Sequence, residues 1–322
     1  MTQTLSRRDV LVHAGAAAAV LALPSAVTGA LGLADAANAA RPNIPFPPAA
    51  KDRIAIATYP FRDFIAGLDD SPNALVGKMD LKDFPAHIGA KLGISKIEPW
   101  SRHFLSTDPK YLHELHSALM KAHGMIVDIA ADGEHSQYSA DAGERDLAVV
   151  FAKKWIDVAA VVGSPSARTN IPPAKDSKPD VERAAETLRR VADYASSKNV
   201  VVHLENDNPV SEDPFFIVQI VQKVNSEWLR ALPDFANSLT TGDEDHAYKG
   251  IDAMFAHAYG ICHIKAMEAN DAGKVFSVDM AKTFGILKAH DYKGYCSMEF
   301  DSPGDPYPGT RGLIDATLKY LS

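Results

Sequence analysis

The sequence predicts a closed (β/α)8 barrel, and three observations support that fold class. After residue 50, short apolar runs alternate with amphipathic helical patterns. This alternation is typical of a parallel sheet covered by helices. Eight such runs fall within about 270 residues, which matches the length of one closed barrel. No G-x-G-x-x-G sequence opens a helix, so an open dinucleotide-binding sheet is the less favoured arrangement.

Each expected element can be placed along the chain. The eight strands are expected at Ile54–Thr58, Ile94–Glu98, Met125–Ala130, Ser166–Asn170, Val200–Glu205, Arg230–Asp234, Gly260–Lys265 and Gly294–Phe300. The fourth could instead begin at Val158. Helices are expected at Tyr111–His123, Ala140–Val162, Pro179–Lys198, Pro214–Val224, Gly250–His257 and Val278–His290. We expect the Pro-rich loops 172–180 and 301–309 to cover a substrate, because long polar loops often do.

The N-terminal 39 residues have the features of an export signal. Ser6-Arg7-Arg8 precedes a small-residue, apolar stretch from Ala14 to Leu33, and Ala37-Asn38-Ala39 supplies an A-x-A cleavage site. The pattern resembles a twin-arginine signal, although Val10 stands where Phe is usual. A membrane anchor and an Ala-rich helix of the mature fold are the alternatives. The stretch is mostly Ala and Gly and contains Pro24, whereas a span needs roughly 20 strongly apolar residues.

Three segments follow from this interpretation. Residues 1–39 are the expected signal peptide, residues 40–50 an extended Pro-rich lead, and residues 51–322 the barrel. The mature protein is then periplasmic or otherwise exported, and it has no stable insertion in the membrane.

The net charge indicates which partners the sequence disfavours, and the cysteine content indicates whether a disulfide is needed. The net charge of −8 gives no basic footprint for nucleic acid, although a local basic groove stays open. The two cysteines, Cys262 and Cys296, are expected to point outward from the barrel as buried free thiols. A disulfide is the alternative, but a domain of this size does not need one.

Four expected strands end in side chains that can bind a metal. Glu205, Asp234, His263 and Glu299 are separated by 29, 29 and 36 residues, each about one strand-plus-helix unit. In a (β/α)8 barrel, residues at successive strand ends converge on one face. Two glutamates, one aspartate and one histidine suit a divalent cation that leaves room for a substrate.

The alternation of side chains along these strands supports the site. His203 shares one face of its strand with Glu205, and Lys265 shares one with His263. A charged side chain within an apolar run is costly unless it is paired, hydrogen-bonded or metal-bound. A salt bridge at a strand end would explain any one of them alone, but four on consecutive strands favour a metal site.

The motifs KIEPW, LEND, PDF, HIK and MEF resemble those of the xylose isomerase-like TIM barrel superfamily. Within it, the chain is most similar to the sugar phosphate isomerase/epimerase group, and the resemblance runs from about Ile54 to the C-terminus. It implies a single divalent metal, most often manganese, with zinc, magnesium or cobalt as alternatives. The positions that match the metal ligands of that family are Glu205, Asp234, His263 and Glu299.

Two positions depart from relatives within that superfamily. Asn237 stands where ketose epimerases carry a histidine three residues after the metal aspartate, which puts that histidine's role in doubt here. The related endonuclease branch carries H-x-N-D, whereas this chain reads His263-Ile264-Lys265-Ala266. The second departure argues against a nuclease that acts on abasic DNA.

The resemblance implies chemistry next to a carbonyl group. Hydrogens at that position are weak acids, and a chelated divalent ion stabilises the enediolate left when one is removed. A carboxylate removes the proton and a second one can return it. Glu205 and Glu299 are the expected catalytic pair. If only one of them is correctly placed, epimerisation gives way to isomerisation or β-elimination.

Further polar and aromatic residues near strand ends are candidates for binding the substrate. They are Lys265, Arg168, His203, Glu98, Asn237, Trp100, His103 and Tyr59, with Phe61, Asp132 and His135 as further candidates. Glu98 could instead pair with Arg102 or Lys96, Arg168 could neutralise the acidic site, and the aromatic side chains could be ordinary packing. His203 could hydrogen-bond a metal ligand or be a core histidine.

The sequence therefore predicts a metal-dependent sugar isomerase or epimerase that acts through an enediolate on a keto-sugar or related hydroxy-carbonyl. A lyase or dehydratase that eliminates β to a carbonyl, for example on a keto-glycoside, is the first alternative. A non-catalytic sugar-binding barrel is the second. The expected partner is a small carbohydrate, and a homo-oligomer is possible.

Overall fold

A computed structural model describes residues 41–68, 77–302 and 304–321. The expected export signal at residues 1–39 lies outside these residues. None of the helices in the described ranges is both long enough and apolar enough to cross a membrane.

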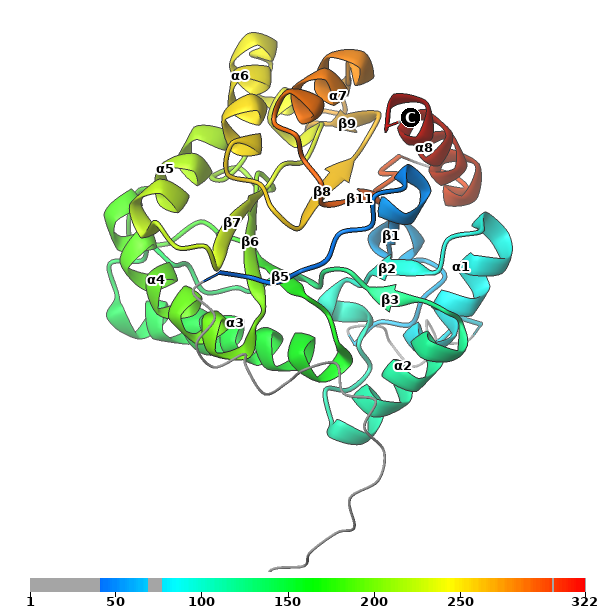
Figure 1. Cartoon of the computed structure of the whole chain (residues 1–322). Helices are drawn as coiled ribbons and strands as arrows, with labels where there is room; N and C mark the ends of the chain where they lie inside the picture. Colours follow the sequence, from blue (N-terminus) through cyan, green and yellow to red (C-terminus); the bar gives the residue numbers. More distant parts are fainter. Residues whose placement is uncertain (1–40, 69–76, 303, 322) are drawn as a thin grey trace, which may run out of the picture. The chain divides into compact units, whose positions relative to one another are not determined.

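Eleven strands are described, and nine of them build a closed parallel barrel (Figure 1). The barrel strands are β1 (Ile54–Ala57), β2 (Lys96–Glu98), β3 (Met125–Ile126), β4 (Ala130–Ala131), β5 (Ser166–Thr169), β6 (Val201–Glu205), β7 (Leu229–Leu232), β8 (Ile261–Ile264) and β11 (Tyr295–Met298). They form two sheets, β3-β2-β1-β11-β8 and β4-β5-β6-β7. Strands β3 and β4 are two pieces of the third barrel strand, which was expected as one run.

Backbone contacts join the two sheets at both edges. Trp100 bridges to Ala130 at one junction. At the other, the His263 N–H donates to the Pro233 carbonyl at 3.0 Å, and the Phe235 N–H donates to the His263 carbonyl at 3.2 Å. The sheet therefore closes on itself, as the sequence predicts.

Eight helices of the described chain surround the strands (Figure 1). They are α1 (Phe84–Leu92), α2 (Pro109–Lys121), α3 (Ala142–Val162), α4 (Val181–Lys198), α5 (Pro214–Val224), α6 (Glu244–Phe255), α7 (Met280–Ala289) and α8 (Pro306–Leu321). Several begin at an aspartate whose side chain accepts a backbone N–H of the first turn, as Asp141 does for α3 and Asp180 for α4. Asn199 ends α4 in the left-handed conformation that asparagine tolerates.

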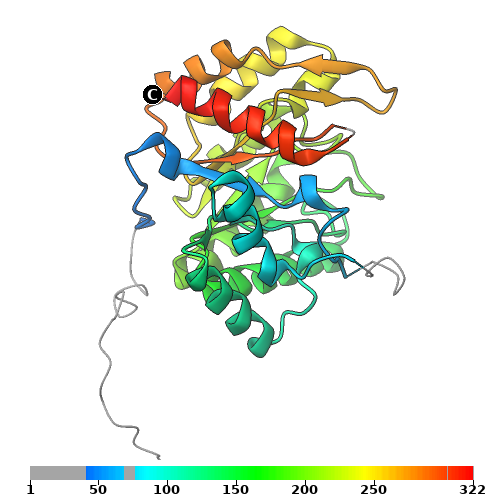
Figure 2. The same cartoon turned by 90° about the vertical axis from the view of Figure 1, so that its right-hand side faces the viewer.

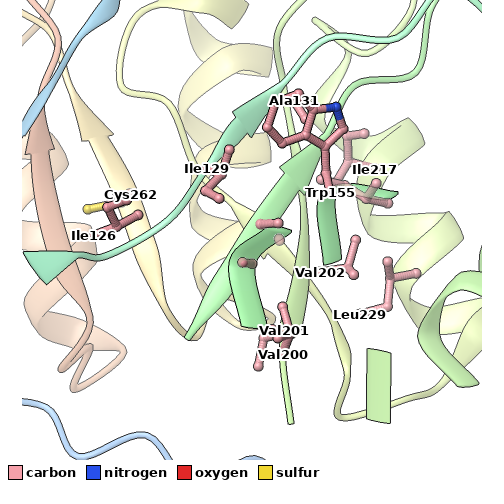
Figure 3. Packing of buried hydrophobic residues seen from close by; sticks show 14 of the residues in the cluster. Ile126, Ile129, Ala131, Trp155, Val200, Val201, Val202, Ile217, Leu229 and Cys262 are labelled. Atoms are coloured by element: carbon pink, nitrogen blue, oxygen red, sulfur yellow. The ribbon is translucent and has the colours of Figure 1, made fainter. Parts of the chain in front are cut away.

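The core lies between the strands and the helices (Figure 3). Side chains such as Val202 of β6, Trp155 of α3 and Ile217 of α5 are almost fully buried there. A smaller apolar cluster, with Ala55, Val127, Leu232, Ile261 and Tyr295, is packed by Phe46. The Pro-rich lead therefore packs against the barrel through Phe46.

Four differences from the expected elements matter for the site. Val158 lies within α3, so the alternative start of the fourth strand is wrong. Helices α1 and α8 are present in addition to the six helices that were expected. Helix α6 begins at Glu244, six residues earlier than expected. A hairpin of β9 (Met267–Ala269) and β10 (Val275–Ser277) follows β8, and in Figure 2 it projects in gold beyond the neighbouring helices.

Candidate functional site

The carboxyl ends of the last four barrel strands bring together the four expected metal ligands. Glu205 ends β6, Asp234 follows β7, His263 lies in β8 and Glu299 follows β11. One donor atom from each lies within 4.8 Å of the others, and all four residues are buried. Their side chains share the inward face of the barrel, as the alternation along each strand requires.

The hydrogen bonds of Asp234 leave one of its oxygens directed at this cluster. Its Oδ1 accepts the backbone N–H groups of Ala236 and Asn237 at 2.8 and 2.7 Å. Its Oδ2 is buried and has no hydrogen-bond partner within the described ranges, and it lies 3.8 Å from both His263 Nδ1 and the Lys265 ammonium. A buried carboxylate oxygen without a hydrogen bond is costly unless a cation neutralises it. Three carboxylates and an imidazole therefore fit a divalent metal.

His263 is held from both sides of its ring. Nδ1 lies 2.8 Å from Glu205 Oε1 and 3.0 Å from Glu299 Oε2. Nε2 lies 2.8 Å from Glu98 Oε1 and 3.0 Å from Glu98 Oε2. Burial lowers the pKa of His263, but the carboxylates of Glu205, Glu98 and Glu299 outweigh it and hold the pKa well above its usual value.

Lys265 and Asn237 connect the cluster to the hairpin. The Lys265 ammonium donates to Asn237 Oδ1 and to Glu268 Oε2, both at 2.9 Å. Asn237 Nδ2 donates to Glu205 Oε1 at 3.4 Å. Asn237 thus bridges the carboxylate of Glu205, an expected metal ligand, and a buried lysine, at the position where the sequence departs from ketose epimerases.

Arg168, at the end of β5, is buried among three carboxylates. Its Nε lies 3.2 Å from Glu205 Oε2, and its Nη1 lies 3.2 Å from Asp207 Oδ2 and also donates to Asp132. Burial lowers the pKa of Arg168, but these three carboxylates raise it well above the usual value. The guanidinium is therefore always charged and already paired.

The ligand carboxylates differ in basicity. Burial raises the pKa of Asp234 to about 7 and also raises that of Glu205. The Glu299 carboxyl has a pKa below its usual value, because Lys265 and His263 together outweigh the effect of burial.

A pocket with a volume of about 590 Å³ opens above the cluster. Its lining includes the predicted residues Tyr59, Glu98, Trp100, Asn237, Lys265, Arg168, Glu205, His263 and Glu299, together with Asp132. The rings of Tyr59 and Trp100 meet edge to face at 5.2 Å, and Trp100 Nε1 donates to Asp132 Oδ2 at 2.6 Å. These two aromatic side chains could pack against one face of a sugar.

Part of the lining comes from connecting segments and was not predicted from the sequence. It consists of Asp207, Pro209, Glu212 and Thr240, with Glu268 to Ala272 of the hairpin. Only the motif LEND, which runs on into Asp207, gave a signal for any of them. Of the two loops that were expected to cover a substrate, loop 301–309 contributes Asp301 to the lining, whereas loop 172–180 does not line the pocket.

Several candidate residues have other partners in the structure. His203 is fully buried, pairs through Nδ1 with Asp128 at 2.9 Å and accepts the Gly260 N–H through Nε2. His103 is buried against Thr58 Oγ1 at 2.7 Å. Neither histidine lines the pocket, which corrects their expected placement there.

Three other candidates are also displaced or occupied. Phe61 is fully buried and packs on Phe84 and Tyr307. His135 pairs with Glu144 and lines a separate depression. Glu98 does line the pocket, but both of its carboxylate oxygens are directed at His263 rather than at Arg102 or Lys96.

The fold is shared with solved structures of low sequence identity. A xylose isomerase-like TIM barrel protein from Mycobacterium smegmatis, in complex with magnesium, is 14% identical with a TM-score of 0.62, over 85% of this chain and 99% of that chain. The 3-keto-D-glucoside 4-epimerase of E. coli is 14% identical with a TM-score of 0.61, over 82% and 98%. D-Psicose 3-epimerase from Clostridium cellulolyticum, with D-tagatose, is 16% identical with a TM-score of 0.62, over 83% and 96%.

Sequence comparison identifies the family. A search of curated protein sequences finds no match to this chain. The family model described as "Xylose isomerase-like TIM barrel" matches residues 87–321, which is most of the chain. The chain therefore belongs to the xylose isomerase-like TIM barrel family.

Proposed function

We propose that this protein is a divalent-metal-dependent sugar isomerase or epimerase that acts on a keto-sugar or a related hydroxy-carbonyl compound. The observation that carries the proposal is the convergence of Glu205, Asp234, His263 and Glu299 beneath a polar pocket. Two of the structurally similar proteins are named as sugar epimerases, which supports the same chemistry here.

The metal and the protein side chains have separate tasks. A divalent ion, with manganese as the proposed species, would stabilise the negative charge that develops when a proton leaves the carbon beside a carbonyl. Asp234 and His263 would hold the ion, and Glu205 and Glu299 would hold it and also move protons. Lys265, 3.5 Å from Glu299 Oε2, donates a hydrogen bond to a substrate oxygen.

The charges of the pocket favour a neutral substrate. Nine carboxylate residues line it: Glu98, Asp132, Glu205, Asp207, Glu212, Glu268, Asp271, Glu299 and Asp301. The two permanently charged cations of the lining, Arg168 and Lys265, are both paired with carboxylates. A phosphate needs free cationic donors and is repelled by a negative cleft. We therefore propose a free sugar, keto-sugar or glycoside as the substrate.

One observation favours a lyase as the second candidate. Oε2 of Glu205 faces Arg168, and the Glu205 side chain is less exposed than that of Glu299. A substrate therefore reaches Glu205 less easily, although burial raises its pKa and the pKa of Glu299 is lowered. A single proton-transferring carboxylate would suit elimination β to a carbonyl as well as isomerisation. Product analysis separates the two reactions, since elimination gives an unsaturated product and epimerisation an isomer.

Metal content and proton exchange test the proposed function. Purified protein and a Glu205→Gln/Glu299→Gln double variant are compared by elemental analysis after incubation with Mn²⁺. We expect near-stoichiometric metal in the wild type and its loss in the variant. Keto-sugars and 3-keto-glycosides are then screened in D₂O for deuterium at the carbon beside the carbonyl. A wild type that takes up no divalent metal would contradict the proposed function.

We also propose that the protein is exported through a twin-arginine signal within residues 1–39, as the sequence indicates. An Arg7→Lys/Arg8→Lys variant, expressed in a bacterium with that pathway, should stay unprocessed in the cytoplasm. Unchanged processing and export of the variant would contradict this.

A further inference from the structure

Glu98 is a buried carboxylate at the end of β2, on the side of His263 that faces away from the other ligands. Its exposed fraction is 1%. Both of its oxygens lie within 3.0 Å of His263 Nε2, and in the described part of the chain its carboxylate has no other hydrogen-bond partner. The other ring nitrogen, Nδ1, faces Glu205 and Glu299.

In this arrangement the two ring nitrogens of His263 have different roles. An imidazole nitrogen binds a metal through its lone pair, so the ring's remaining proton must sit on the other nitrogen. A carboxylate that accepts this N–H fixes the tautomer, orients the ring and makes the metal-bound nitrogen more basic. Glu98 stands where such an acceptor is needed.

We propose that Glu98 is a positioning residue for metal binding, which keeps the proton of His263 on Nε2 and leaves Nδ1 as the donor atom. This inference rests on the proposed function, because it requires the metal site. It replaces the earlier expectation that Glu98 binds a substrate hydroxyl, since both oxygens are already used.

A second buried pair in the barrel provides a matched control. Asp128 and His203 are both fully buried, and His203 Nδ1 lies 2.9 Å from Asp128 Oδ1. His203 Nε2 accepts the Gly260 N–H at 3.3 Å, so neither ring nitrogen is left to bind a metal. Loss of the Asp128 charge should therefore perturb folding without affecting metal affinity.

The test measures Mn²⁺ affinity rather than turnover. Full-length wild type, Glu98→Gln and Asp128→Asn proteins are stripped with EDTA and titrated with Mn²⁺, and the free ion is followed by electron paramagnetic resonance. Thermal unfolding of each metal-free protein is recorded alongside. We expect Glu98→Gln to weaken Mn²⁺ binding about 10- to 100-fold, as is typical when such a partner of a metal ligand is lost. Asp128→Asn should lower Tm and leave the Kd unchanged.

A second measurement uses the wild type alone, so it stands even if a variant fails to fold. In the zinc-loaded, ¹⁵N-histidine-labelled protein, long-range ¹H–¹⁵N correlation should place the His263 proton on Nε2. A proton on Nδ1 would overturn the inference, as would equal Mn²⁺ affinity in wild type and Glu98→Gln. If the wild type bound neither Mn²⁺ nor Zn²⁺, the proposed function would fail and this inference with it.

Discussion

Arg168 and Glu205 form a buried ion pair, with Nε of the guanidinium 3.2 Å from Oε2 of the carboxylate. The other oxygen of Glu205 faces His263 at 2.8 Å. Glu299 lies across the cluster, where its Oε2 is 3.5 Å from the Lys265 ammonium, and its side chain is 12% exposed against 2% for Glu205. The two glutamates are therefore not equivalent, and Glu299 is better placed to exchange a proton with a molecule in the pocket.

Loss of the Arg168 charge should strongly destabilise the protein. In an Arg168→Met variant, the buried Glu205 carboxylate keeps its desolvation cost without its partner. Removing one member of a buried pair typically costs about 3–5 kcal/mol. The free energy of unfolding in urea measures the loss for metal-free protein.

The matched control for Arg168 is Arg190→Met, which removes an exposed ion pair with Asp146 at 2.8 Å. Exposed pairs contribute roughly 0–1 kcal/mol, because water solvates both charges. Equal, small losses in the two variants would show that the guanidinium of Arg168 is not needed to stabilise the buried carboxylates.

Metal affinity should rise with pH through neutrality. In the metal-free protein, burial raises the pKa of Asp234 to about 7, so below that pH a proton occupies a carboxylate that the ion requires. Below pH 7 the affinity should fall about tenfold per pH unit for each competing proton, and above that pH the contribution of Asp234 should level off. Titration with Mn²⁺ at several pH values from about 5.5 to about 8.5, where most folded proteins are stable, checks the direction of the change. An affinity that fell as the pH rose would contradict the assignment of Asp234 as a ligand.

Strand ends carry most of what could be predicted from the sequence. Short, mostly apolar runs indicated where the barrel strands lie. The alternation of side chains along each strand then indicated which of them face inward. Glu205 and His263 were placed in this way. His203 lies on the same face of its strand as Glu205, but it is one layer deeper in the barrel, where it contacts Asp128 and does not reach the pocket. The depth of a side chain within the barrel depends on how the strands are staggered when the barrel closes, and the alternation along one strand does not determine this.

Connecting segments were the harder part to predict. The hairpin β9–β10 has no long apolar run, since Met267 and Val275 are exposed and only Phe276 packs inward. Its position depends on tertiary contacts, such as the one between Lys265 and Glu268 at 2.9 Å. Glycine and asparagine in Asn270–Lys274 indicate a turn, but they do not show what the turn covers.

The hairpin should affect substrate binding and leave metal binding unchanged. Residues Glu268 to Ala272 line the pocket but include none of the four candidate metal ligands. Replacing Met267–Ser277 by a short Gly-Ser turn should lower kcat/KM about 10- to 100-fold on the sugar that the wild type converts, since positioning contacts are lost. Mn²⁺ affinity should stay at the wild-type value. A variant with normal kcat/KM would show that the hairpin does not contact the substrate.

Cys262 and Cys296 should be two free thiols that react only after unfolding. They face each other on neighbouring strands in register, with the sulfurs 3.8 Å apart, and both are fully buried. That distance is well beyond the roughly 2.05 Å of a disulfide bond. Burial raises the pKa of the Cys262 thiol well above its usual value, whereas the hydrogen bond from Cys262 lowers the pKa of Cys296, so the burial of both sulfurs is what protects them from a reagent. A thiol reagent such as DTNB should therefore find no group in the native protein and both groups in guanidinium chloride. Fast reaction in the native state would contradict the burial, and the absence of thiols after unfolding would indicate that the pair had oxidised.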